Sequence, residues 1–216
     1  MVNNKLKFIR YVKRSFLRIG IHRFLPAKLL VRLGYISYLS QWIRRHKNIG
    51  YTTFPFNGFN SKLREGLYEY LIDTQSLDDE IDYLEFGVAQ GTSFKWWIAH
   101  IHNKKAQFNG FDTFTGLPED WGHFKKGDMT SNNEQPKIDD DRHQFHQGLF
   151  QVTLPRFLEN YTGIRRKVIH LDADLFSSTL FVLTSLSPYL KPGDVLLFDE
   201  FNVPLDEFKA FKVWVD

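Results

Sequence analysis

Six acidic residues stand at or directly after the ends of four short apolar runs, each written like a β-strand. In a parallel sheet the carboxyl ends of the strands share one edge, and ligands bind just outside that edge. We therefore expect these acids to face a common site instead of decorating the surface. They are Glu85, Asp112, Asp172, Asp174, Asp199 and Glu200.

Four of these acids form a group of their own, because they follow two runs that we expect to be neighbouring strands about 4.8 Å apart. Carboxylates that converge repel one another unless a cation neutralises them, and oxygen ligands favour a hard ion such as Mg²⁺. A metal that holds a substrate hydroxyl lowers its pKa, and a spare carboxylate can accept the proton. Solvated strand ends and helix caps are the alternative interpretation of Asp172, Asp174, Asp199 and Glu200.

The stretch 83–93 reads as a strand, a tight turn and the start of a helix, with Gly87 and Gly91 in the turn. Glycine lets a ligand approach the backbone more closely than a Cβ would permit. Ser93 lies at the expected helix N-terminus, where nucleotide-type ligands bind. Asp112, 21 residues after Gly91, is placed to accept the hydroxyls of a ribose.

The spacing of the two glycines decides which ligand is favoured. Gly-x-x-x-Gly lacks the Gly-x-Gly-x-x-Gly pattern that brings a pyrophosphate onto a helix. Glu85, which precedes the turn, would also repel a phosphate but tolerate a sulfonium or an amino group. Both features favour S-adenosylmethionine over a dinucleotide, and an NAD-dependent α/β oxidoreductase is the alternative enzyme.

Apolar runs alternate with amphipathic segments, which predicts an α/β fold with a parallel sheet and right-handed crossovers. We expect five strands in the spatial order 3-2-1-4-5, at residues 81–86, 107–111, 143–147, 167–171 and 194–198. The helices expected around them are 61–74, 92–102, 154–161 (opened by a proline), 177–190 and one from 205. The long polar stretch 113–141 is expected to be a lid or a binding loop.

Residues 1–50 contain twelve lysines and arginines and no acid, whereas the remainder has sixteen basic and twenty-five acidic residues. We predict two helices in this basic arm, Leu6–Leu25 and one from Ala27. The arm fits a helical cap or dimer contact, or a helix on an anionic membrane surface. We expect no nucleic-acid partner, because no recognised module accompanies the charge.

The apolar runs are too short for a membrane span, and charges interrupt every candidate signal-peptide core. We therefore expect a cytoplasmic protein, with the basic arm as its only candidate contact to a membrane. The chain has no cysteine, which excludes disulfides and a cysteine nucleophile.

Five motifs follow one another along residues 61–216: EFGVAQGTS (85–93), GFDTFTGLP (110–118), GLFQVTLP (148–155), HLDADLFSST (170–179) and PGDVLLFDEF (192–201). Together they resemble the macrocin O-methyltransferase (TylF-like) family. The resemblance does not extend to the basic arm. It implies a Rossmann-like class I fold and an S-adenosylmethionine- and Mg²⁺-dependent O-methyltransferase that typically acts on sugar hydroxyls of natural products.

The resemblance also implies roles for individual residues, carried over by motif. Glu200 stands where the family often has a second Asp, and it is still a competent oxygen ligand. The implied set is Asp172, Asp199 and Glu200 for the metal, Asp174 as general base, Glu85, Gly87 and Ser93 for the methionine end of the cofactor, Asp112 for its ribose, and Gln147, Gly148 and Leu149 near its adenine.

We expect residues 1–50 to form a basic helical extension and residues 51–216 the methyltransferase domain. Class I methyltransferases end with a further helix and an antiparallel hairpin beside strand 5, and this chain leaves no room for them before Asp216. We therefore expect either a C-terminally incomplete domain or a partner, such as a second copy, covering strand 5, since strand 5 would otherwise be an apolar sheet edge. A non-catalytic membrane-associated protein with the same fold is the rival interpretation.

Overall fold

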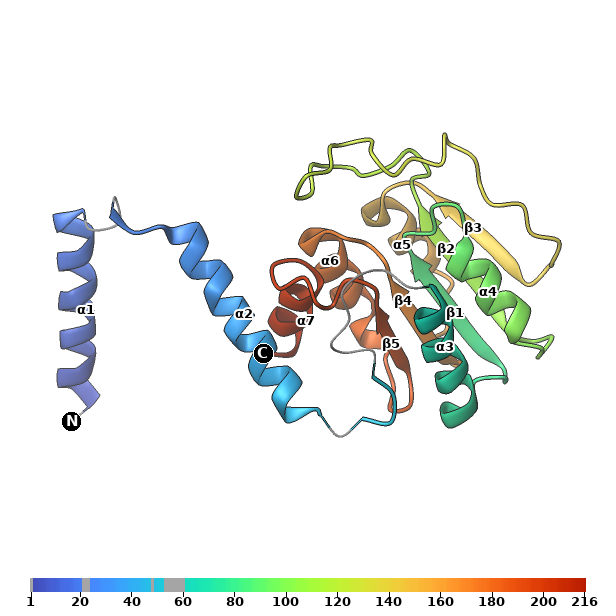
Figure 1. Cartoon of the computed structure of the whole chain (residues 1–216), viewed down its shortest axis with the longest axis horizontal. Coiled ribbons are helices and arrows are strands. Elements are labelled where there is room, and N and C mark those ends of the chain that lie inside the picture. Colours follow the sequence, from blue (N-terminus) through green and yellow to red (C-terminus); the bar gives the residue numbers. More distant parts are fainter. Residues whose placement is uncertain (1, 21–23, 48, 53–60) are drawn as a thin grey trace. The chain divides into compact units, whose positions relative to one another are not determined.

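The computed structural model describes residues 2–20, 24–47, 49–52 and 61–216 (Figure 1). The chain divides into two compact units, Met1–Arg45 and His46–Asp216. The first unit contains helices α1 (Val2–Ile19) and α2 (Ala27–Arg45). Among the described residues, we find no helix with the length and apolar character needed to cross a bilayer.

The second unit is built on one five-stranded sheet, and every pair of neighbouring strands is parallel. The spatial order of the strands is β3-β2-β1-β4-β5, which confirms the predicted order. Parallel pairing brings the carboxyl ends of all five strands to one edge. The strands are β1 (Ile81–Phe86), β2 (Gln107–Asp112), β3 (His143–Gln147), β4 (Arg166–Leu171) and β5 (Val195–Phe198).

Helices cover both faces of this sheet (Figure 1). On one face, α3 (Ser61–Gln75) and α4 (Thr92–His100) pack through Tyr68 and Trp97 against β1, β2 and β4. On the other face lie α5 (Phe150–Leu158), α6 (Phe176–Leu186) and α7 (Glu207–Val215). Burial on both faces explains why neighbouring residues of one strand, such as Tyr83 and Leu84 of β1, are both apolar.

Among the helices that cover the sheet, α5 differs most from its predicted position. The proline at 155 was expected to open a helix over 154–161, but α5 begins at Phe150 and contains Pro155 in its second turn. Phe150 packs edge-on against Phe86 of β1, and Leu154 is fully buried against the sheet. Burial of these side chains stabilises the earlier start, although the proline removes one helical hydrogen bond.

The other differences are confined to helix ends. Helix α6 stops at Leu186 and continues as a 3₁₀ turn over Ser187–Tyr189, since Pro188 cannot donate a backbone hydrogen bond. Helix α1 spans Val2–Ile19, not Leu6–Leu25, whereas α2 starts at Ala27 as predicted. The predicted loop 113–141 contains no helix and no strand beyond one bridge between Trp121 and Phe124.

Candidate active site

A cavity of about 720 Å³ lies at the carboxyl ends of the strands, within the range of roughly 300–1,000 Å³ that is usual for small-molecule sites. The turn after β1, the loops after β2, β4 and β5, and the start of α5 form its wall. The predicted site residues in that wall are Gly87, Ser93, Asp112, Leu149, Asp172, Asp174, Asp199 and Glu200.

The turn after β1 passes very close to the end of β4. Gly87 has a positive φ of 97°, and a Cβ built on it would lie 1.8 Å from the carbonyl oxygen of Asp172. Only glycine combines this conformation with this approach. Gly91, with φ of 74°, precedes the first residue of α4. The turn therefore keeps its shape through two glycines, and the close approach of a ligand to their backbone stays a prediction.

Asp112, at the end of β2, holds the same turn from the other side. Its Oδ2 accepts the backbone N–H groups of Val88 and Ala89, both at 2.7 Å, and its Oδ1 accepts that of Phe114 at 2.7 Å. A carboxylate has about four acceptor positions, so three backbone bonds leave one for a ligand hydroxyl. The ribose contact stays a prediction.

Glu85 is fully buried behind the turn and is not part of the cavity wall. It accepts hydrogen bonds from the Tyr83 hydroxyl and, at 2.7 Å, from the Ser93 hydroxyl. Its Oε2 also lies 3.6 Å from Nδ1 of His170. Burial by itself would lower the pKa of His170, but the hydrogen bond and charge of Glu85 outweigh it and raise that pKa. Glu85 thus positions Ser93, which does line the cavity.

The residues after β4 and β5 bring acids together as predicted. Asp172 and Asp199, together with His170, each offer a ligand atom within 4.8 Å of the others. Burial, followed by the charge of Asp199, raises the pKa of Asp172. Arg64 from α3 donates to Oδ2 of Asp199 at 2.5 Å. Glu200 lines the same cavity but lies outside this three-residue cluster.

Asp174 is the acid with an unusual backbone. Its φ of 56° lies in the left-handed region, which costs a non-glycine residue of order 1–3 kcal/mol and recurs at functional sites. Burial, then the charges of Glu200 and Asp199, raise the pKa of Asp174 to about 7. A carboxyl group with such a pKa is suited to exchange a proton near neutral pH.

Besides Glu85, three of the predicted cofactor residues are not part of the cavity wall. Gln147 donates to Oδ1 of Asn133 at 2.5 Å and so holds the long loop. Gly148 has a φ of 140° and leads into α5. The contact of these two residues and of Gly91 with a cofactor stays a prediction.

Sequence reasoning missed His170, Arg64 and Glu207. His170 had a visible signal, because it lies two residues before Asp172 and alternate residues of a strand share a face. No sequence signal links Arg64 to the site, because 135 residues separate it from Asp199. Glu207 begins α7 and is fully buried; its Oε2 accepts the backbone N–H of Glu200 at 2.8 Å.

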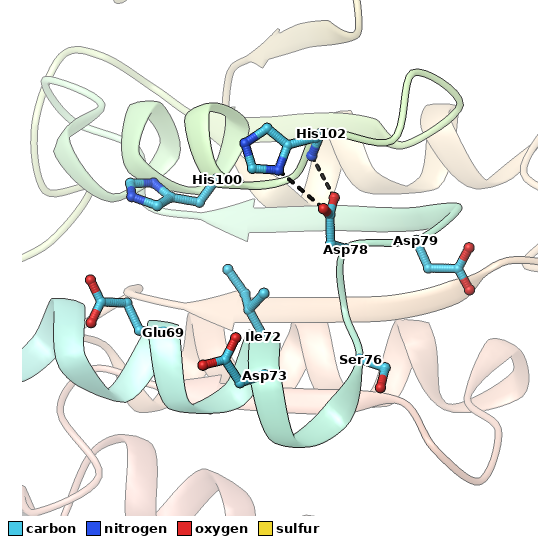
Figure 2. A pocket seen from close by; sticks show the side chains of 8 residues that line it. All are labelled: Glu69, Ile72, Asp73, Ser76, Asp78, Asp79, His100 and His102. Carbon is cyan, nitrogen blue, oxygen red and sulfur yellow. Dashed lines mark hydrogen bonds and ion pairs between the residues drawn. The ribbon is translucent and has the colours of Figure 1, made fainter.

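A second cavity, of about 650 Å³, lies where α3 and α4 end, next to the amino end of β1 (Figure 2). It is rich in acids and also contains His100 and His102. Figure 2 shows Asp78 paired with both the backbone and the ring of His102. Its position at the opposite ends of the strands separates it from the acids after β4 and β5.

Comparison with known proteins extends these findings. A family model described as "Methyltransferase domain" matches residues 84–201. The chain is 30% identical over 157 residues to the 8-demethyl-8-(2,3-dimethoxy-alpha-L-rhamnosyl)-tetracenomycin-C 4'-O-methyltransferase of Streptomyces olivaceus, a match that covers 62% of this chain and 59% of the relative. The chain thus spans about three-fifths of the length of that curated relative.

Two solved structures share the fold. A crystal structure of CalS11, described as a calicheamicin methyltransferase, superposes with a TM-score of 0.58 at 20% identity, over 84% of this chain and 83% of the other. The apo structure of CalS11, described as a TDP-rhamnose 3'-O-methyltransferase, gives 0.53 at 23% identity, over 84% of each chain.

The parallel sheet of order 3-2-1-4-5, with helices on both faces and a glycine turn after β1, defines the Rossmann-like methyltransferase fold. Because the family model matches more than half of the chain, the assignment can be made more specific. The chain belongs to the methyltransferase domain family.

Proposed function

We propose that the chain is an S-adenosylmethionine-dependent O-methyltransferase of the macrocin O-methyltransferase (TylF-like) type, acting on a hydroxyl of a sugar or glycosylated small molecule. The observation that carries this proposal is a single cavity whose wall contains both the glycine turn, at Gly87, and the acids Asp172 and Asp174. One cavity of this kind can hold a methyl donor and an acceptor hydroxyl against each other.

We assign the cofactor to the part of the cavity beside the turn. When bound there, S-adenosylmethionine supplies the methyl group. Gly87 lets it approach the backbone, Asp112 has one acceptor position for a ribose hydroxyl, and Leu149 offers an apolar contact to the adenine. Ser93 binds the methionine end, with its hydroxyl oriented by Glu85.

We assign Mg²⁺ to Asp172, Asp199 and Glu200. The donors fit a hard cation, since all are carboxylates, and the raised pKa values of Asp172 and Glu200 reflect burial and the charge of Asp199. A divalent cation at this position would supply positive charge that lowers the pKa of the acceptor hydroxyl. His170 lies beside these acids but already contacts the Tyr83 hydroxyl at 3.0 Å through Nδ1.

Asp174 is the proposed proton acceptor. It lines the cavity next to Asp172, and its left-handed backbone is a strained conformation of the kind found at functional sites. With S-adenosylmethionine bound, the acceptor oxygen would form its bond to the methyl carbon as the sulfur–methyl bond breaks, which would leave S-adenosylhomocysteine, and the hydroxyl proton would pass to the Asp174 carboxylate. Positioning and charge stabilisation supply the rest of the catalysis.

The proposed acceptor class rests on the proteins that this chain resembles. One is named for a rhamnosyl group and another for TDP-rhamnose, and both support a deoxysugar as the first acceptor to test. A cytoplasmic location and a homo-oligomer are part of the same proposal. The NAD-dependent alternative is less favoured, because the family match and the glycine spacing both point to methyl transfer.

The test is a calorimetric titration of the protein with S-adenosylmethionine and with NAD, followed by turnover of TDP-rhamnose with and without EDTA. We expect binding of S-adenosylmethionine alone and turnover that EDTA abolishes and Mg²⁺ restores. Binding of NAD in its place would overturn the methyltransferase assignment. Turnover that survives rigorous chelation would overturn only the metal assignment.

A further inference from the structure

The proposed function does not explain the basic arm, residues 1–50. Within this arm, α1 is much more strongly amphipathic than α2. We propose that α1 is a docking helix that lies flat on an anionic lipid surface. The proposal concerns the helix itself and is independent of the chemistry at the strand ends.

Helix α1 separates its side chains into two faces. Leu6, Ile9, Val12, Phe16 and Ile19 recur at three- and four-residue steps and so share one face. Ile9, Val12 and Ile19 of this set are 53%, 48% and 71% exposed. An apolar stripe of this length that stays open to solvent marks an interaction surface.

The opposite face of α1 is cationic. Lys7, Arg10, Arg14 and Arg18 recur at three- and four-residue steps on that side. The first acid of the chain is Glu65, so no carboxylate within the first 64 residues offsets these charges. A helix with an apolar face and a polar face whose charged residues are all cationic is complementary to the two layers of an anionic bilayer surface, the acyl boundary and the headgroups.

Two other occupants of the apolar face are less well matched. A second copy of α1 would bring two cationic faces together without the opposite charges that usually accompany paired helices. Within residues 61–216 the exposed large apolar side chains are scattered over the long loop, α5, residue 164 and α7, for example Phe124, Val152, Ile164 and Val213. Residues 61–216 as the structure describes them therefore offer no apolar stripe of comparable length.

The test is co-sedimentation of the full chain with vesicles of phosphatidylcholine containing phosphatidylglycerol, and with vesicles of phosphatidylcholine alone. We expect binding to the anionic vesicles only, weakening as salt is added because the attraction is screened. Replacing Lys7, Arg14 and Arg18 by Gln should weaken binding roughly a hundred-fold, since each cation near such a surface contributes roughly five-fold.

Two further variants separate membrane docking from other effects. Ile9→Gln with Phe16→Gln should weaken binding at least about ten-fold, through loss of apolar burial. The matched control, Ile164→Gln with Val213→Gln, removes exposed apolar groups elsewhere and should bind vesicles like the parent. Unchanged binding of S-adenosylmethionine to each variant shows that the catalytic unit is folded.

Three results would overturn the proposal. The first is no binding of the parent chain to anionic vesicles, and the second is equal binding to both vesicle types. The third is a dimer, measured by light scattering, that Ile9→Gln with Phe16→Gln dissociates while vesicle binding is unaffected; the apolar face would then bind a second copy. None of these results bears on the methyl transfer.

Discussion

Glu207 accepts the backbone N–H of Glu200 through Oε2 at 2.8 Å, and this bond joins the first turn of α7 to the loop after β5. Its other oxygen, Oε1, accepts the backbone N–H of Ala173 at 3.4 Å in the loop after β4. One buried carboxyl group thus connects the two loops that carry the acids of the site. We infer that Glu207 is a positioning residue, because it does not line the cavity itself.

The first prediction is that Glu207→Gln weakens the binding of Mg²⁺. Burial raises the pKa of Glu207 to about 9, so glutamine closely matches its size and its charge near neutral pH. In either orientation, however, the NH₂ group of glutamine faces one of the two backbone N–H groups. The loops after β4 and β5 should then shift relative to each other. Mg²⁺ affinity measured by calorimetry should fall roughly 10–100-fold, while S-adenosylmethionine affinity stays within about two-fold.

A general loss of stability needs its own control. Asp82 is another buried acid, near the amino end of β1, where it accepts a hydrogen bond from Tyr161 at 2.9 Å and pairs with Arg165. We expect Asp82→Asn to lower the free energy of unfolding by about 1–3 kcal/mol without changing Mg²⁺ affinity. If Glu207→Gln lowers both ligand affinities equally, its role is structural only.

The second prediction concerns Asp174, the proposed proton acceptor. Asn has nearly the same shape and tolerates the left-handed backbone of this position, but it cannot take up a proton. Asp174→Asn should lower kcat by about 10²–10⁴-fold and leave the dissociation constant of S-adenosylmethionine within about two-fold. Activity close to that of the parent, with the same acceptor, would remove Asp174 from the mechanism.

Much of this site followed from the sequence because strand ends are easy to locate. A buried parallel strand is a continuous apolar run, so the polar residue that ends it also marks the edge of the sheet. That reasoning placed Asp172 and Asp199 at the cavity, and the structure brings their ligand atoms within 4.8 Å of each other. The predicted spatial order of the strands was also confirmed.

The parts that sequence reasoning missed depend on contacts between distant segments. The pairing of Arg64 with Asp199 joins α3 to the end of β5. No local sequence pattern in either segment predicts this contact. Glu207 lies in the first turn of α7, and the packing of α7 against α6 brings its carboxyl group to both loops, a contact that the sequence does not indicate. The misplaced start of α5 has a similar cause, because packing of Phe150 on Phe86 outweighed the proline signal.

The third prediction separates steric clash from backbone strain at Gly87. Gly87→Ala adds a methyl group that would lie 1.8 Å from the carbonyl oxygen of Asp172, at a φ of 97°. We expect a loss of about 2–5 kcal/mol in the free energy of unfolding, from strain and overpacking together, and at least about ten-fold weaker S-adenosylmethionine binding. Urea denaturation and calorimetry measure the two effects.

The matched control for this substitution is Gly122→Ala. Gly122 also has a positive φ, 56°, but a Cβ there meets nothing within 4 Å. It should therefore cost only the left-handed conformation, about 1–2 kcal/mol, with cofactor affinity unchanged. Equal effects of the two substitutions on stability and binding would show that the close approach to Asp172 has no consequence.

The fourth prediction is a pH dependence of stability that arises from His146 in β3. Its ring stacks on Phe111 at 4.5 Å and meets the edge of Phe157, and its Nε2 lies 3.0 Å from Oδ1 of Asn109. Burial lowers the pKa of His146 below its usual 6.5. The unfolded chain therefore binds a proton more readily than the folded one, and stability should fall as the pH drops from above 6.5 towards the lowered folded-state pKa.

His146→Gln tests this sign directly. Glutamine can place a donor near Asn109 but does not titrate, so its free energy of unfolding should depend less on pH across this window than that of the parent. Urea denaturation of both proteins at pH 8 and at successively lower pH, down to about 5, measures the difference. Well above pH 6.5, where the imidazole is neutral in the folded and the unfolded chain, the free energies of unfolding of the two proteins should change equally with pH. A parent protein that becomes more stable relative to the variant on acidification would show that the ring is better protonated in the folded state, contrary to the effect of its burial.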